Sequence, residues 1–367
     1  MNNRLLRIGD PVPWFKARTS VNPEFTFASL GGHYTLLCCC GDTRNELSAR
    51  LVDGFLQRQE QLAALGLILF ALSLAEIAPS RAAAITDPAR VKLAHAPDGH
   101  ICTLLGGLDL TASGARECRL VTYLINPVLQ VAAVFPVVDA DRHAAEVLAF
   151  CRHLPPPLPP SPAMPHAPVL RVPNVLSPEE CNHLVGLYRG GHSHPSGFMR
   201  EVDGRTVQVH DPDFKRRHDF SLAHHPDVQE KLNRRLLKRV APFIERAFQF
   251  RISRFERYLV SRYAAETQAF FLPHRDNTSK GTVHRRFAMS LGLCNGLYEG
   301  GHLRFPEYGT ALYRPALGEA IIFSCSLLHE VTPITRGERL VLLSFFYNDE
   351  DALLSEANRR FVALETL

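Results

Sequence analysis

A proline-rich segment at residues 154–168 is the feature that most restricts how this chain can fold. Eight of its fifteen residues are proline. Proline lacks the backbone N–H that helices and sheets require, and runs of it favour an extended polyproline II conformation. We therefore expect a stiff linker between two domains, one over residues 1–153 and one over residues 169–367. The length of 367 residues also suits two domains better than one.

The second predicted domain contains a group of potential metal ligands. His274 and Asp276 are two positions apart, so in an extended strand both side chains point to the same face. His329 follows 53 positions after Asp276, which leaves room for several strands before a third ligand. Two imidazoles and one carboxylate are the set that holds non-haem Fe(II) from one side. The pattern predicts an iron centre made by His274, Asp276 and His329.

Arg339 lies ten positions beyond His329, far enough for a turn and a return strand. Its guanidinium is always charged and can bind both oxygens of the distal carboxylate of a dicarboxylic acid cosubstrate. A second pattern of the same kind, His225-Pro226-Asp227, provides an internal comparison. Apolar residues at helical spacing follow it, and Asp and Pro are common where helices begin. We interpret this second pattern as a helix start.

Short apolar segments separated by glycine and proline surround the potential ligands. They predict strands at residues 254–263, 287–293, 320–323 and 339–347. Short strands at this spacing are typical of a double-sheet jelly roll.

Residues from about 167 to 347 resemble the catalytic domain of the prolyl-4-hydroxylase-like 2-oxoglutarate/Fe(II) dioxygenases. The motifs that carry the resemblance are Tyr263, His274-Arg275-Asp276, Tyr298-Glu299-Gly300-Gly301, Gly318, His329 and Gly337-Glu338-Arg339. The resemblance implies a double-stranded β-helix (jelly roll) with flanking helices. It also implies that His274, Asp276 and His329 bind Fe(II) and that Arg339 binds the C5 carboxylate of 2-oxoglutarate. Tyr263 matches a tyrosine that lines the cosubstrate pocket; a core aromatic with its hydroxyl on a carbonyl is an equal alternative.

This resemblance implies an Fe(II)- and 2-oxoglutarate-dependent dioxygenase that uses O2, hydroxylates a protein side chain, and releases succinate and CO2. L-ascorbate as a further cofactor is left open, and free amino acids or small metabolites are alternative substrates. The polar segment 277–286 is a candidate lid or substrate contact, or else an ordinary exposed loop. A catalytically inactive binding module is disfavoured, because all three ligands and Arg339 occur together.

The first predicted domain alternates between strands and helices. Its predicted elements are a strand at 34–40, a helix at 45–65, a strand at 67–72, a hairpin of 119–125 with 130–138, and a helix at 139–153. A βαβ unit followed by ββα indicates an α/β thioredoxin-like domain. With the segment 9–15 and the segment 122–127, residues 4 to 153 resemble the peroxiredoxins.

The chain lacks the reactive cysteine that peroxiredoxins have. That family places a cysteine at the start of the helix after the first core strand, three residues after a threonine. Here Thr43 is present, but Glu46 occupies the cysteine position. Arg119 matches the family's thiol-activating arginine and would have no thiol to activate. Three adjacent cysteines lie earlier, in the predicted strand, where cysteine is usually a small buried hydrophobe: Cys38, Cys39 and Cys40.

We therefore expect a domain without peroxidase activity that serves docking, recognition or dimerisation, with a homodimer through this domain as an open option. A rival hypothesis is a thiol-based redox protein that uses the three adjacent cysteines. Nine cysteines without a CxxC pair do not form a disulfide framework. With no apolar run of about 18 residues and no apolar leader, the expected compartment is the cytoplasm and no membrane contact is expected.

Basic residues cluster in the second half of the chain, although the net charge is only +4. The densest clusters are Lys215-Arg216-Arg217-His218, Arg234-Arg235 with Lys238-Arg239, and Arg285-Arg286. We interpret them as a solvated helix face and a charged loop, with attraction of an anionic substrate or acidic partner as the alternative. Nucleic acid is disfavoured, because no aromatic residues that would stack on bases are interleaved with the basic ones.

Overall fold

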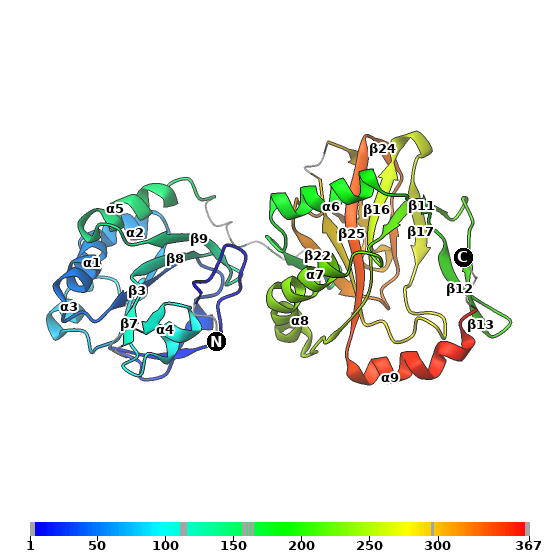
Figure 1. Ribbon diagram of the computed structural model, residues 1–367. Coiled ribbons are helices and arrows are strands. Elements are labelled where there is room, and N and C mark those ends of the chain that lie inside the picture. Colours follow the sequence, from blue (N-terminus) through cyan, green and yellow to red (C-terminus); the bar gives the residue numbers. More distant parts are fainter. Residues whose placement is uncertain are drawn as a thin grey trace. The chain divides into compact units, whose positions relative to one another are not determined.

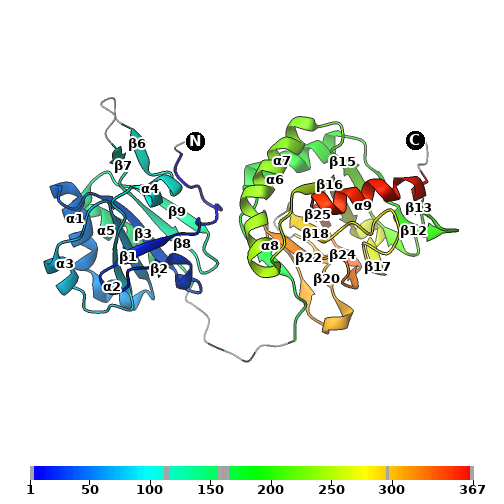
Figure 2. The same ribbon diagram turned by 90° about the horizontal axis from the view of Figure 1, so that it is seen from below.

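The computed structural model of the protein describes residues 4–110, 116–155, 160, 162, 165–294 and 297–363. The chain divides into two compact units, Met1–Ser161 and Pro162–Leu367, which Figures 1 and 2 show from two sides. The division falls inside the proline-rich segment, of which 156–159, 161, 163 and 164 lie outside the described residues. Of the helices that the described residues form, none has the length and apolar character needed to cross a membrane.

The first unit is built on a seven-stranded sheet with the order β2-β1-β5-β4-β3-β8-β9. The strands are β1 (Lys16–Thr19), β2 (Phe25–Thr26), β3 (Thr35–Gly41), β4 (Ile68–Ser73), β5 (Val91–His95), β8 (Val121–Ile125) and β9 (Val131–Pro136). β3 is parallel to β4 and antiparallel to β8, and β8 is antiparallel to β9. A separate hairpin joins β6 (Leu108–Leu110) to β7 (Arg116–Cys118).

Helices cover this sheet and define a core on each of its faces. The helices in the described part of the unit are α1 (Glu46–Leu56), α2 (Gln59–Ala64), α3 (Pro79–Ala83), α4 (His100–Leu104) and α5 (Ala140–Cys151). α1 and α5 lie side by side (Figure 1) and pack on the β3 side chains Leu36, Cys38 and Cys40. The alternate residues Leu37 and Cys39 belong to the core on the other face. The predicted order of β3-α1-β4 followed by β8-β9-α5 is confirmed, and the fold is thioredoxin-like.

One predicted helix of the first unit is divided in two. The sequence predicted a single helix over 45–65, whereas α1 ends at Leu56 and α2 begins at Gln59. The side-chain amide of Gln59 donates to the carbonyls of Leu56 (3.0 Å) and Ala84 (2.8 Å). A side chain thus satisfies the Leu56 carbonyl where a continuing helix would use a backbone N–H.

The second unit contains two antiparallel sheets of unequal size. Their orders are β10-β22-β18-β25-β16-β15-β11 and β14-β17-β23-β20-β21, and the pairs β12-β13 and β19-β24 stand apart. The strands of the larger sheet are β10 (Leu170–Val172), β11 (His194–Pro195), β15 (His218–Ser221), β16 (Arg254–Ala264), β18 (Phe287–Gly292), β22 (Ala320–Ser324) and β25 (Glu338–Tyr347). Those of the smaller sheet are β14 (Lys215–Arg216), β17 (Phe270–His274), β20 (Leu303–Arg304), β21 (Leu312–Tyr313) and β23 (His329–Val331). The paired strands are β12 (Phe198–Val202), β13 (Arg205–Val209), β19 (Glu299–Gly300) and β24 (Ile334–Arg336).

Alternating side chains of the larger sheet separate two layers. On one face, Leu340, Leu342 and Phe346 of β25 pack in a core with α6 (Pro178–Gly190), α7 (Pro226–Arg239) and α8 (Ala241–Phe248), which Figure 2 shows together on one side of the sheet. On the other face, Val341 packs with Val331 of the smaller sheet. The two sheets therefore face one another, and the inner layer lies between them. A further helix, α9 (Asp349–Asn358), follows β25.

Several local predictions for this unit are confirmed. The four predicted strands correspond to β16, β18, β22 and β25. The structure also shows a capping box of Ser177 and Glu180 at the start of α6. α7 begins at Pro226 directly after His225, so the second His-x-Asp pattern is a helix start.

Gly337 provides a test of the turn between β24 and β25. Its φ is +69°, and a Cβ there would lie 2.3 Å from the Leu297 carbonyl oxygen. Gly337→Ala should therefore lower the free energy of unfolding by at least about 1–3 kcal/mol, measured by urea denaturation of the full chain. Gly186→Ala in α6 is the control, because no atom lies within 4 Å of the added methyl group. It should be neutral or stabilise by up to about 1 kcal/mol. Equal urea midpoints for Gly337→Ala and the parent protein would show that a Cβ at position 337 causes no strain.

Candidate active site

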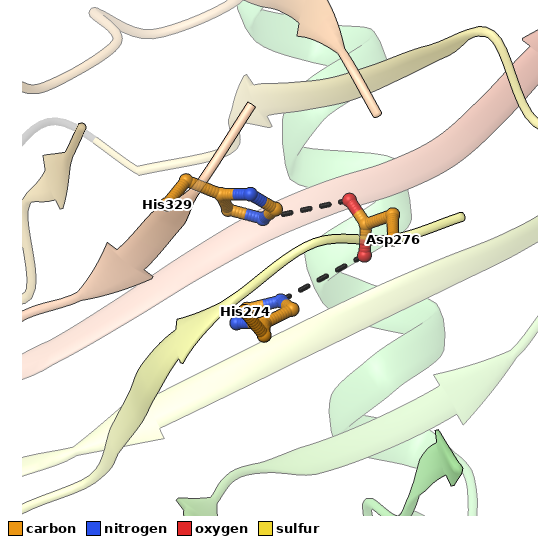
Figure 3. Close-up of side chains that lie close together, drawn as sticks. All are labelled: His274, Asp276 and His329. Carbon is orange, nitrogen blue, oxygen red and sulfur yellow. Dashed lines mark ion pairs between the residues drawn. The ribbon is translucent and has the colours of Figure 1, made fainter. Parts of the chain in front are cut away.

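His274, Asp276 and His329 meet at one point between the two sheets. His274 ends β17, His329 begins the neighbouring strand β23, and the two residues are opposite one another in the antiparallel register. Asp276 lies in the turn after β17, not within the strand as predicted. Its carboxylate oxygens are 3.7 Å from Nε2 of His274 and 3.4 Å from Nε2 of His329 (Figure 3).

Backbone contacts fix the state of both imidazole rings. Nδ1 of His274 donates to the Leu272 carbonyl at 2.8 Å, and Nδ1 of His329 donates to the Leu327 carbonyl at 3.0 Å. With the proton on Nδ1, the lone pair of each Nε2 faces Asp276. Burial, and then the neighbouring His329, lowers the pKa of His274 well below its ordinary value. Its ring is therefore neutral, as a metal ligand requires.

The three side chains fit a divalent metal ion. Their ligand atoms all lie within 4.8 Å of one another, and all three side chains are largely buried. Two imidazole nitrogens and one carboxylate oxygen on one side are the donor set expected for Fe(II) with open positions opposite. The role of each residue as an iron ligand stays a prediction.

A cavity of about 440 Å³ opens beside the triad. Its wall contains His274, Asp276 and His329, together with Arg339 and Tyr263. The sequence-predicted residues of the site are thus all brought to one space. Apolar side chains of both sheets, such as Phe271 and Phe323, complete much of the wall.

Arg339 is a buried cation whose hydrogen-bonding capacity is only partly used. It is 1% exposed, and Nη2 donates to the Ser290 hydroxyl at 3.0 Å. Nε and Nη1 are buried without a hydrogen-bond partner in the described parts of the chain. A buried guanidinium with unsatisfied N–H groups is costly unless an anion binds it. The geometry therefore leaves a place for a carboxylate at this end of the cavity.

Tyr263 lies opposite Arg339 in the ladder between β16 and β25. The Arg339 guanidinium is 5.2 Å from the centre of the Tyr263 ring. The Tyr263 hydroxyl accepts from Nη1 of Arg217 at 3.3 Å. Tyr263 is buried in the core of the inner layer and also forms part of the cavity wall, so its role in the cosubstrate pocket stays a prediction.

The interpretation of the first basic cluster as solvated is wrong for two of its members. Lys215 and Arg217 are buried and line the cavity. Arg217 pairs with Asp219 at 2.6 Å, and Asp219 also accepts from the Ser261 hydroxyl at 2.6 Å. Burial raises the pKa of Asp219, but the charges of Arg217 and Lys215 outweigh it and hold that pKa below its ordinary value. The signal in the sequence was the period of two in Lys215, Arg217 and Asp219, which is typical of a strand with one buried face.

The segment 277–286 is not an ordinary exposed loop. Ser279, Thr282, His284 and Arg285 within it are buried. His284 and Arg285 both donate to the carboxylate of Glu256, which ties the segment to β16. The interpretation of the third basic cluster, Arg285-Arg286, as solvated is therefore wrong for Arg285, which is buried and lines the cavity.

The first unit offers no reactive thiol at the position where peroxiredoxins have one. Glu46 is the first residue of α1, and Thr43 contacts the Ser73 hydroxyl at 3.3 Å. The three adjacent cysteines of β3 are fully buried, and burial raises the pKa of Cys38 to about 12 and those of Cys39 and Cys40 well above the ordinary value. Because the thiolate is the reactive form, these side chains do not support the rival redox hypothesis.

Known proteins similar to this chain include iron-dependent oxygenases that match the second unit. Residues 258–347 match the model of the 2OG-Fe(II) oxygenase superfamily. A PKHD-type hydroxylase of Nitrobacter winogradskyi is 26% identical over 201 residues, which cover 52% of this chain and 82% of that protein. A PKHD-type hydroxylase of Shewanella sp. (strain ANA-3) is 30% identical over 184 residues, which cover 47% of this chain and 74% of that protein.

Among solved structures, the peroxidoxin BcpB of Mycobacterium tuberculosis is similar with a TM-score of 0.36 and 16% identity, covering 41% of this chain and 99% of that one. The two hydroxylases show the family of this chain, since 82% and 74% of their own lengths are matched and the second is 30% identical. The matched family supplies Fe(II) and 2-oxoglutarate chemistry, and the triad and Arg339 fit both. The chain belongs to the PKHD-type hydroxylases of the 2OG-Fe(II) oxygenase superfamily and is a prolyl-hydroxylase-like dioxygenase that uses Fe(II) and 2-oxoglutarate.

Proposed function

We propose that this dioxygenase hydroxylates a side chain of a protein or peptide, with His274, Asp276 and His329 as the iron ligands and Arg339 as the anchor for the C5 carboxylate of 2-oxoglutarate. The observation that carries the proposal is the partly unsatisfied guanidinium of Arg339 in the same cavity as the triad. A buried cation and three converging ligands account for both a dicarboxylic cosubstrate and a metal.

When bound, iron supplies the redox chemistry that couples decarboxylation of 2-oxoglutarate to hydroxylation of a substrate C–H bond by O2, with succinate and CO2 as products. The protein holds and orients the reactants. The carbonyls of Leu272 and Leu327 keep both imidazoles with Nε2 free. Arg339 binds the far end of the cosubstrate, and the ring of Tyr263 forms the adjoining wall. Apolar residues such as Phe271 and Phe323 exclude water from the same space.

The substrate class is tested by succinate release from the Fe(II)-loaded protein across capped peptides that contain proline, other peptides, free amino acids and small metabolites. L-ascorbate belongs in the assay as an auxiliary reductant. Stimulation by peptides above the rate without substrate supports the proposal. Stimulation by free amino acids or small metabolites alone would assign the alternative substrate class.

We also propose that the two facing sheets of the second unit form a double-stranded β-helix, which their antiparallel orders and shared core support. We propose domains at 1–153 and 169–367 joined by the linker 154–168, and a docking, recognition or dimerisation role for the first. A cytoplasmic location is part of the proposal, supported by nine free cysteines.

Removal of one iron ligand tests the metal centre. His274→Ala should abolish stoichiometric Fe(II) binding and the decarboxylation that depends on it, because two remaining side chains cannot hold the ion from three sides. Iron content after anaerobic loading and desalting is the measurement. His225→Ala, at the helix start of α7, should bind iron as the parent protein does. Full iron retention by His274→Ala would refute the ligand assignment.

Truncation of the proposed anchor tests the cosubstrate site. Arg339→Ala removes a buried charged contact of about 2–5 kcal/mol, so the Kd for 2-oxoglutarate should rise about thirtyfold or more. Iron binding should change little, since the guanidinium is not a ligand. Arg336, whose side chain is 78% exposed beside Glu299, is the matched control. Arg336→Ala should change the Kd by less than about threefold. A larger loss at Arg336 than at Arg339 would move the anchor elsewhere.

Removal of Asp219 tests how much the buried Arg217–Asp219 ion pair, next to Tyr263, contributes to stability. Asp219→Ala leaves Arg217 buried without its partner, so we expect a loss of about 3–5 kcal/mol in the free energy of unfolding at pH 7. Because the folded-state pKa of Asp219 is lowered, its contribution is present above about pH 3.9 and is lost as the pH falls through the folded-state pKa. Glu299→Ala, from an exposed pair, should cost less than about 1 kcal/mol. Similar unfolding midpoints for the two variants would show that the buried pair is dispensable.

A further inference from the structure

Arg257 is a cavity residue to which the proposed function gives no role. It lies on β16, six positions before Tyr263, and lines the cavity with Leu259 and Phe345. Its side chain is exposed, and the guanidinium lies 5.7 Å from the centre of the Phe345 ring. In the parts of the chain that the structure describes, this guanidinium forms no hydrogen bond and no ion pair.

A bulge in β16 directs Arg257 into the cavity. The register with β25 shifts between Glu256 and Leu259, and Arg257 has a φ of +36°, which non-glycine residues rarely adopt. Phe255 and Tyr258, three positions apart, both pack in the core beneath the helices. The two residues between them, Glu256 and Arg257, therefore lie on the cavity side of the sheet. Bulges that re-aim a side chain are common beside active sites.

Of the two carboxylates whose charges act most on Arg257, Glu256 is already engaged. Glu256 accepts from Nε of Arg285 at 2.9 Å and from Nε2 of His284 at 2.9 Å. A second contact runs from Nη2 of Arg285 to the other oxygen of Glu256. Both oxygens thus serve the segment 277–286, and Glu256 does not pair with the residue next to it.

The second carboxylate is engaged as well. Asp219 pairs with Arg217 and accepts from the hydroxyls of Ser196 and Ser261. The guanidinium of Arg257 is protonated at neutral pH, as arginine side chains in proteins are. One full positive charge in the wall is left without a protein anion.

We propose that Arg257 binds a carboxylate of the primary substrate, so that the enzyme acts on carboxylate-bearing molecules. This inference rests on the proposed function, in which the triad and Arg339 hold iron and 2-oxoglutarate. Arg257 and Arg339 enter the cavity from different points, since Tyr263, the partner of Arg339, is about 20 Å from Arg257 along the strand at about 3.3 Å per residue. The second cation therefore faces a part of the cavity beyond the cosubstrate anchor.

The surroundings of Arg257 favour a carboxylate on a carbon skeleton. One planar guanidinium matches the two oxygens of a single carboxylate. Its neighbours in the wall, Leu259, Leu343 and Phe345, are apolar and suit the adjoining part of the substrate. Of the other cations in the wall, Lys215 is buried and donates to the Gly197 carbonyl at 2.6 Å. The exposed Arg200 lies over the rings of Phe198 and Phe214, 5.0 and 5.8 Å from their centres. A free organic acid and an acidic side chain of a peptide share the required chemistry.

Binding to the full-length protein tests the inference without turnover. The protein is loaded with Mn(II) and saturating 2-oxoglutarate and titrated by calorimetry with matched probes. Phenylacetate and phenylacetamide represent the free acid, and a capped pentapeptide with central Glu or Gln represents the peptide. At least one carboxylate should bind saturably and at least about tenfold more tightly than its amide, a difference of about 1.4 kcal/mol or more. Binding of phenylacetate would indicate a free organic acid as substrate, and binding of the Glu peptide would indicate an acidic peptide.

Substitutions on β16 test whether Arg257 itself causes the preference for a carboxylate. Arg257→Met should lose the preference for the carboxylate and keep the Kd for 2-oxoglutarate within about threefold, and Arg257→Lys should restore part of the preference. Arg254→Met, from an exposed pair with Asp349 on the same strand, should behave as the parent protein does. Circular dichroism establishes that each variant is folded.

Three results would overturn the assignment of Arg257. They are no binding of either carboxylate by the loaded parent protein, an undiminished preference in both Arg257 variants, and a loss of 2-oxoglutarate binding in place of probe binding. Failure of the parent protein to bind 2-oxoglutarate at all would instead refute the proposed function. The two failures are therefore distinct.

Discussion

Strand β25 pairs with β16 on one side and β18 on the other, and its alternating side chains supply both layers of the second unit. Leu340, Leu342 and Phe346 fill the core beneath the helices. Arg339 and Phe345 point the opposite way, into the cavity. A shift of this strand by one residue would exchange the two sets, placing apolar side chains in the cavity and a guanidinium in the core. The stability of the core and the position of Arg339, the proposed cosubstrate anchor, thus depend on one register.

Charge in the cavity follows from the same arrangement. Of the four buried cations that line it in the described parts of the chain, two have a protein anion: Arg217 has Asp219, and Arg285 has Glu256. Arg339 has only a hydroxyl, which leaves a buried charge whose desolvation an incoming carboxylate would offset. The same reasoning applies to Arg257, which differs in being open to the cavity. Arg339 and Arg257 are therefore the two guanidiniums to which we assign an anion, one for the proposed cosubstrate and one for the proposed substrate.

The sequence predicted the parts of the site that depend on spacing. The return strand to Arg339 is a local consequence of strand geometry, so it could be predicted from the sequence. Asp276 was expected to share a strand with His274 but reaches the triad from the turn after β17. Arg257 could not be predicted, because a bulge arises from how two strands pair and an arginine with positive φ has no sequence signature. Lys215 was misjudged for a related reason: a run of basic residues looks solvated until the period of two within it is considered.

The first unit has the predicted order of strands and helices but no thiol at the start of α1. Its strand β3 is buried on both faces, so alternate cysteines fill two separate cores and act as small apolar side chains. The start of α1, where a helix dipole would stabilise a thiolate, holds Glu46 instead. A carboxylate there gains the same favourable interaction with the helix N-terminus but is not a thiol nucleophile. The helix start is thus retained as a structural feature while the thiol chemistry is absent from that position, and the oxidation chemistry of the chain resides in the second unit.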